Sequence, residues 1–127
     1  MEKRDRSHRY GKAPSLIYTC SGVADVGAIA DLAGRKLNAE RVGKMSCIAG
    51  IAAQISDIVG AGRSAGKIVA IDGCDFDCTK RVLELAGFHR FAHIRVADHG
   101  MPKGESPPTD ERVEAIASLA KSALIEG

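Results

Sequence analysis

The sequence predicts an α/β fold: a small three-layer sandwich in which helices cover both faces of a mostly parallel, four-stranded sheet. Strand-like and helix-like segments alternate about every 27 residues, as in βαβ units. Residues 67–71, Lys-Ile-Val-Ala-Ile, are apolar after the first position, as expected for a strand covered on both faces of a parallel sheet. At 127 residues the chain has room for one domain with a core of its own.

The first half of the chain contains two pairs of strand and helix. Residues 15–19 are rich in strand formers, and residues 23–37 repeat apolar side chains at helical spacing after Gly22. Residues 41–46 give a weaker strand prediction. Residues 48–62 are rich in alanine and isoleucine and end in glycines, which predicts one helix. The order of strand, turn and helix therefore occurs twice.

The second half repeats this order after the strand at residues 67–71. Residues 78–88 predict a helix that ends at Gly87, and residues 90–98 predict a fourth strand. Residues 99–108 contain three of the four prolines of the chain and predict a linker.

The last helix is predicted over residues 109–125. Thr109 can cap its amino end, where Asp110 and Glu111 interact favourably with the helix dipole. Its apolar side chains fall on one face: Val113, Ile116, Ala117, Ala120 and Leu124. We expect residues 14–127 to form a single α/β domain.

The charge of the chain argues against a nucleic-acid surface. Its 18 basic and 16 acidic residues nearly balance. Basic residues gather near the start, so residues 1–13 are predicted to form a flexible basic arm. No apolar run approaches the roughly 18 residues of a membrane span, and no signal peptide is recognised. We therefore expect a cytoplasmic protein that binds neither nucleic acid nor membrane, and the sequence specifies no protein partner.

Four cysteines carry the candidate chemistry. Cys20, Cys47 and Cys74 lie 27 residues apart, each within two residues of the carboxyl end of a predicted strand or just beyond it. Sites in open parallel sheets form at this rim. If the next helix begins near residues 75–77, Cys78 lies one turn after Cys74 and both sulfurs can reach one point. In the reducing cytoplasm, four thiols favour a metal site or catalysis over disulfides.

The order of the strands decides whether the sulfurs can meet. Sulfur ligands of tetrahedral zinc lie about 3.8 Å apart and neighbouring strands about 4.8 Å apart, so adjacent strand ends need only modest convergence. The order 2-1-3-4 places Cys20 between Cys47 and Cys74, whereas 3-2-1 separates Cys74 from Cys20 by roughly 10 Å. Helix amino ends at this rim favour thiolates. We expect the order 2-1-3-4 and one Zn²⁺ held by Cys20, Cys47, Cys74 and Cys78.

Other interpretations of the same thiols stay open. An iron–sulfur cluster would use the same ligands, although the ferredoxin spacings are missing. A thiol oxidoreductase or sulfur-transfer enzyme would use Cys74 and Cys78, or Cys20, as nucleophiles. Buried cysteines can also serve only as small apolar residues in a core. A phosphatase loop is disfavoured, because no cysteine is followed six residues later by arginine. No particular reaction is predicted.

Three polar residues are candidates for supporting a metal site without being its main ligands. Asp72 precedes Cys74 and could accept hydrogen bonds near the thiolates. Asp25 could act in the same way or cap a helix. His99 follows the fourth strand and could replace a cysteine or shuttle protons, with a solvated loop histidine as the alternative. His93 lies within a strand and is predicted to be a packed or edge residue.

The segments "CSGVADVGAIAD" (residues 20–31) and "DGCDFDCTKRVLELAG" (residues 72–87) together resemble the DGC-domain family of small zinc-binding proteins. The family is named for the motif that occurs here as Asp72, Gly73 and Cys74. The similarity covers most of residues 15–96. The family's four cysteines are taken as zinc ligands, and the matching positions are Cys20, Cys47, Cys74 and Cys78. The resemblance implies metal binding and no established reaction.

Overall fold

The computed structural model describes residues 13–126, and its centre is one parallel sheet of four strands in the order β2-β1-β3-β4. The predicted α/β class and the order 2-1-3-4 are confirmed. The basic arm predicted at residues 1–13 lies, apart from Ala13, outside the described residues. The strands are β1 (Ser15–Thr19), β2 (Lys44–Met45), β3 (Lys67–Asp72) and β4 (Ala92–Arg95).

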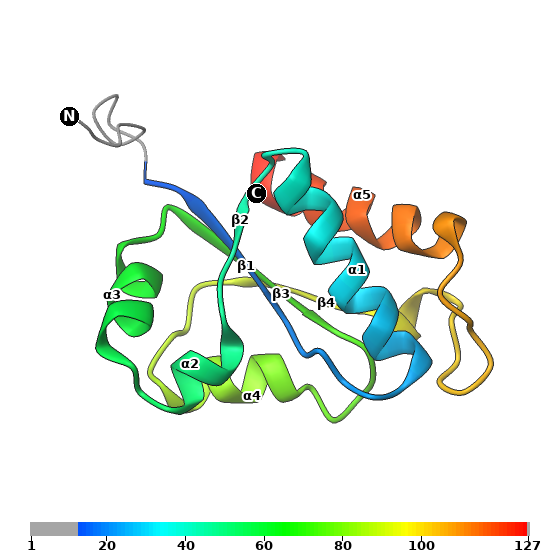
Figure 1. Ribbon diagram of the computed structural model, residues 1–127, viewed down its shortest axis with the longest axis horizontal. Coiled ribbons are helices and arrows are strands. Elements are labelled where there is room, and N and C mark those ends of the chain that lie inside the picture. The colour runs from blue at the N-terminus through cyan, green and yellow to red at the C-terminus, as the bar shows by residue number, and fades with distance from the viewer. Residues whose placement is uncertain (1–12, 127) are drawn as a thin grey trace.

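Helices cover both faces of this sheet (Figure 1). Helices α1 and α5 lie on one face, and α2, α3 and α4 lie on the other. Within residues 13–126, no helix combines the length and the apolar character needed to cross a membrane. The helices are α1 (Asp25–Ala39), α2 (Ile48–Ala52), α3 (Ser56–Ser64), α4 (Cys78–Leu85), the 3₁₀ helix η2 (Val96–His99) and α5 (Asp110–Glu126).

The core consists of two apolar clusters, one on each face of the sheet. Alternate residues of a strand point to opposite faces, so Ile17 packs under α1 and α5 while its neighbour Tyr18 packs under the other helices. Both side chains are fully buried. In β3, Val69 and Ala70 divide in the same way. Strands β1 and β3 are the two central strands of the sheet, and helices cover both of their faces. These two strands therefore fix the position of the loops that follow them.

The single helix predicted over residues 48–62 is wrong, because the chain breaks there into α2 and α3. Gln54 adopts a left-handed conformation with φ of 60°, which no helix can include, and the chain then folds back. Gly50 permits this packing, since a Cβ at that position would overlap the side chain of Ile58. Apolar spacing continues through the break, so the sequence pattern alone did not reveal it.

The fourth strand is shorter than the predicted 90–98. After β4 the chain turns into η2, where Arg95 donates to the carboxylate of Asp98 at 3.0 Å. Gly100, with φ of 75°, ends this turn. Strand β2 is likewise only two residues long, within the predicted 41–46. Both are edge strands, and each has one neighbour to pair with.

Helix α5 begins where its capping residue predicts. The Oγ1 of Thr109 accepts a hydrogen bond from the backbone N–H of Arg112 at 3.3 Å. The buried face of the helix consists of Ile116, Ala117, Ala120 and Leu124, with Val113 partly buried beside it. This face packs against α1 and closes one side of the sheet, and the chain that leads into α5 passes the carboxyl rim of the strands.

Candidate thiol site

A cavity of about 180 Å³ opens at the carboxyl end of the sheet, where the loops after β1 and β3 meet. Cys20, Cys74 and Cys78 all line it. Among its other lining residues are Val23 and Phe76, which are apolar and exposed, and Lys103. The structure therefore brings three of the four predicted ligands to one cavity, from segments more than fifty residues apart.

Cys20 continues β1 into the cavity. Its backbone N–H donates to the carbonyl oxygen of Ile71 at 3.2 Å, which keeps it level with the end of β3. Burial raises the pKa of the Cys20 thiol, hydrogen bonds from the N–H groups of Gly22 and Gly73 oppose this, and the charge of Asp72 adds to the rise. The site without a cation therefore favours the protonated thiol at Cys20, and a bound cation would favour the thiolate.

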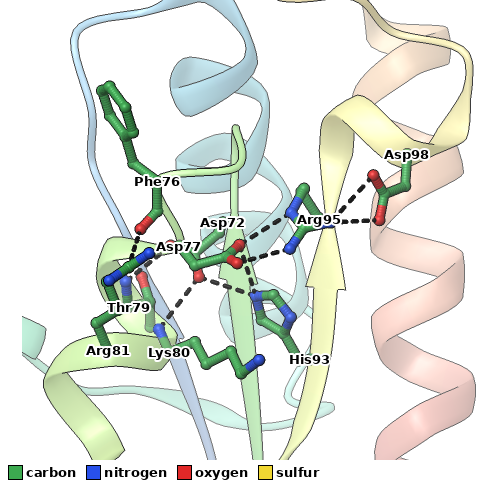
Figure 2. Close-up of polar contacts among 9 residues, drawn as sticks. All are labelled: Asp72, Phe76, Asp77, Thr79, Lys80, Arg81, His93, Arg95 and Asp98. Atoms are coloured by element: carbon green, nitrogen blue, oxygen red, sulfur yellow. Dashed lines mark hydrogen bonds and ion pairs between the residues drawn. The ribbon is translucent and has the colours of Figure 1, made fainter. Parts of the chain in front are cut away.

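Cys74 and Cys78 lie on either side of a tight turn. Helix α4 begins at Cys78, as the predicted segment 78–88 does, so Cys74 lies before the helix and not at its first turn. Asp77 instead adopts a left-handed conformation with φ of 51°, and its N–H donates to the carbonyl of Cys74 at 3.1 Å. Arg81 holds the turn from the helix by donating to the carbonyl of Phe76 at 2.7 Å (Figure 2). The turn nevertheless directs both cysteines to the cavity.

Cys47 is separate from the other three cysteines. It is exposed, it directly precedes α2, and it does not line the cavity. The pairing of Ile17 with Met45 places Cys47 level with Thr19, hence at the same end of the sheet. Within residues 13–126, no three cysteine sulfurs lie within 4.8 Å of one another. A compact group of four sulfurs is thus not part of the described structure.

Glycines allow the loops around the cavity to approach closely. A Cβ at Gly73 would lie 2.6 Å from the backbone nitrogen of Gly27, and a Cβ at Gly27 would lie 2.8 Å from the carbonyl oxygen of Gly22. The loop after β3 therefore packs directly on the first turn of α1. This close approach explains the glycine of the Asp-Gly-Cys motif, because a side chain there would push Cys74 away from Cys20.

Asp72 connects β3 to α4. It is 1% exposed, and its carboxylate accepts hydrogen bonds from the N–H groups of Thr79 at 2.8 Å and Lys80 at 3.1 Å (Figure 2). Nε2 of His93 lies 2.9 Å from the same carboxylate. Burial acts to raise the pKa of Asp72, but the contacts with His93 and with the helix N–H groups outweigh it, and the pKa is lowered. A charged Asp72 thus caps α4 from the strand and fixes the loop that carries Cys74 and Cys78.

Arg95 fixes Asp77 in a similar way. Its Nη2 lies 2.6 Å and its Nε 2.9 Å from the two carboxylate oxygens of Asp77, a bidentate pair (Figure 2). The hydrogen bonds from Arg95 lower the pKa of Asp77. Sequence reasoning missed this pair and the partnership of His93 with Asp72. The available signal was that positions 93 and 95 point to the same face of β4, and that β4 pairs with the end of β3.

One group of residues has the spacing of a metal site without cysteine. The ligand atoms of Asp72, Asp77 and His93 lie within 4.8 Å of one another. Each carboxylate, however, already accepts from strong donors, namely helix N–H groups for Asp72 and the Arg95 guanidinium for Asp77. We assign this group to positioning the loop, because a cation would compete with donors that the fold already supplies.

Asp25 and Lys103 bring a distant segment to the cavity. The Asp25 carboxylate accepts from the N–H groups of Gly104 and Ser106, both at 2.8 Å, and these bonds lower its pKa. Nζ of Lys103 lies 3.6 Å from Sγ of Cys74. Sequence reasoning did not single out Lys103, because this residue lies in the predicted linker. His99 is exposed at the end of η2 and does not line the cavity.

Two of the three comparisons with known proteins found a match. A family model described as the DGC domain matches residues 16–120. A protein of Pseudomonas aeruginosa, described as the anaerobic and virulence modulator AnvM, is 34% identical over 88 residues, which are 69% of this chain and 67% of that protein. No solved structure matches.

Proposed function

The chain belongs to the DGC-domain family, and from this membership and the cavity at the sheet rim we propose that it binds one Zn²⁺ through cysteine thiolates. The observation that carries the proposal is that Cys20, Cys74 and Cys78 line the same cavity. Thiolates are soft ligands, and zinc is commonly held by three or four of them in proteins. These three residues would hold the ion, and Cys47 would supply the fourth thiolate from the neighbouring loop.

The surroundings of the cavity suit a cation with thiolate ligands. The acidic side chains beneath it already have partners within the protein: Asp72 contacts His93 and helix N–H groups, and Asp77 contacts Arg95. The cavity therefore offers sulfur rather than free carboxylate, which favours zinc over calcium or magnesium. A cation would also reverse the effect of burial that keeps Cys20 protonated.

The proposed role of the ion is structural or regulatory. Four thiolates complete the tetrahedron of zinc and leave no position for a catalytic water. The related Pseudomonas aeruginosa protein is described as a modulator, which supports a regulatory role in preference to catalysis. We propose the same class of role for this chain.

Elemental analysis of protein purified without chelator tests the proposal. We expect one zinc per chain, and zinc content near zero in Cys20→Ser, Cys74→Ser and Cys78→Ser. Cys47→Ser is expected to hold zinc more weakly rather than to lose it, because the three cysteines that line the cavity remain together in this variant alone. Ser122→Ala, which removes an exposed hydroxyl from α5, is the control and should keep its zinc. A chain that binds no zinc, as purified or on titration, contradicts the proposal.

A second candidate is a thiol oxidoreductase or sulfur-transfer enzyme. One observation favours it: the ammonium of Lys103 lies 3.6 Å from Sγ of Cys74, and Cys78 lines the same cavity. A thiolate with a second thiol nearby is the arrangement of an attacking and a resolving cysteine. Titration of accessible thiols separates the two functions. If the thiols react with the reagent only after a chelator is added, the result supports zinc binding. Metal-free protein with one fast-reacting cysteine supports the enzyme. An absorbance band in the visible range indicates an iron–sulfur cluster.

A further inference from the structure

Lys103 touches the cavity through its charged end. Its Nζ lies 3.6 Å from Sγ of Cys74 and 4.7 Å from the centre of the Phe76 ring. Phe76 is 64% exposed, and its backbone carbonyl is held by Arg81. The ammonium thus lies between a sulfur and an aromatic face, both of which attract a cation.

The backbone around Lys103 is fixed by contacts rather than left as a free loop. The turn from Pro102 to Ser106 is closed by the hydroxyl of Ser106, which donates to the Pro102 carbonyl at 2.8 Å. Ser106 is 1% exposed. Asp25, at the start of α1, accepts from the N–H groups of Gly104 and Ser106 on either side of the turn. One carboxylate therefore holds Lys103 over the cavity from almost eighty residues away in the chain.

The charge of the cavity explains why a cation belongs at this position. Among the described residues that line the cavity, Lys103 is the basic one, and the acidic ones, Asp72 and Asp77, are paired with His93 and Arg95. Zinc with three or four thiolates carries a net negative charge, which the protein has to balance. Only the ammonium of Lys103 is available among these lining residues to do so.

We propose that Lys103 is the counter-charge of the thiolate site and that Asp25 is the positioning residue that holds it there. This inference rests on the proposed zinc binding and adds a control on how tightly the site keeps its ion. Lys103 stabilises the loaded site by its charge and by its contact with Cys74. Movement of the Pro102 to Ser106 turn away from Asp25 would remove that charge and speed the release of zinc.

The test measures the rate at which excess chromogenic chelator removes zinc from the loaded chain. Lys103→Met is expected to release zinc about fivefold faster than the unaltered chain at low salt, the scale of one partly exposed ionic contact. Lys103→Arg should restore the slow rate, and Asp25→Asn should give an intermediate one. Added salt should speed release from the unaltered chain and leave Lys103→Met unchanged, because ions screen the charge. Lys67→Met, at the amino end of β3, is the matched control.

Each outcome decides between the two proposals. Equal release rates for the unaltered chain and Lys103→Met would overturn the role of Lys103 but leave zinc binding intact. Fast release from Lys103→Arg, equal to that from Lys103→Met, would have the same meaning. An unaltered chain that takes up no zinc overturns both. Thermal unfolding of each variant shows whether it is folded. If Lys103→Met is unfolded, the zinc release rate of Asp25→Asn, which keeps the lysine, shows whether the position of Lys103 controls release.

Discussion

Asp72 and Asp25 each hold together parts of the chain that are far apart. Both carboxylates accept from backbone N–H groups, Asp72 from the start of α4 and Asp25 from the turn around Lys103. Charge-assisted bonds of this kind are about twice as strong as neutral ones. At the scale of single residues, the site therefore depends on two aspartates that are not themselves proposed ligands.

Asp72→Asn is expected to lower the free energy of unfolding by about 1–3 kcal/mol near neutral pH, since a buried ionic acceptor is replaced by an amide. The pKa of Asp72 is lowered in the folded chain, so its contribution is present above the unfolded pKa of about 3.9 and is lost as pH falls through the folded pKa. Urea unfolding from pH 7 down to pH 2 measures both effects.

The variant should therefore lose less stability than the unaltered chain as the pH falls below about 4. Asp75→Asn, an exposed carboxyl in the same loop, is the control and should behave as the unaltered chain. Parallel stability curves for Asp72→Asn and the unaltered chain would show that Asp72 does not cap α4 as a carboxylate.

Helices α2 and α3 illustrate how packing overrides a periodic pattern. The apolar spacing of residues 48–62 suits one helix, but the chain folds back so that Ile58 lies against Gly50. Apolar side chains of both short helices then pack in the same cluster on one face of the sheet. At the scale of elements, the absence of a side chain at one glycine decides the break.

Two glycine substitutions separate packing from helix propensity. Gly50→Ala should reduce the free energy of unfolding by about 1–3 kcal/mol, because its methyl group overlaps Ile58. Gly60→Ala, inside α3 with nothing within 4 Å of the new Cβ apart from neighbouring backbone of the helix itself, should increase the free energy of unfolding by about 0.5–1 kcal/mol. Denaturant unfolding of both variants measures the difference. Similar effects at the two positions would contradict the packing of α2 against α3.

The whole molecule owes its core to apolar packing and not to the cysteines. Two clusters, one on each face of the sheet, contain the fully buried apolar side chains, and no cysteine is among them. Cys20 and Cys74 only pack at the edge of the cluster under α1 and α5. The cavity therefore lies on a fold that apolar burial already stabilises.

If the chain binds zinc as proposed, we expect it to stay folded when the ion is removed. When free zinc is initially at about a thousand times its dissociation constant, chelation should lower the free energy of unfolding by about 4 kcal/mol. Unfolding should remain a single cooperative transition. Circular dichroism during thermal unfolding, with and without chelator, measures this, and Cys74→Ser should show no effect of zinc. Loss of the α/β spectrum on chelation would mean that the metal, like that of a zinc finger, drives folding.

The sequence by itself determined the parts of this protein that depend on near neighbours. Strand and helix alternation, burial of both faces of β3 and the Thr109 cap follow from patterns within a few residues of each other. The strand order was also predicted correctly, from the hypothesis that the cysteines meet at one rim with Cys20 in the centre. The approach of three cysteines to one cavity follows from that order.

Only the tertiary structure decided which distant groups meet at the rim. The contacts of Lys103 with Cys74, of Asp25 with Gly104 and of Asp72 with His93 join loops whose paths depend on how α1, α4 and β4 pack. Cys47 follows its strand as predicted but lies outside the cavity, because α2 begins beside it and carries the chain away. Local patterns specify which element a residue belongs to, whereas the packing of whole elements sets the distance between their loops.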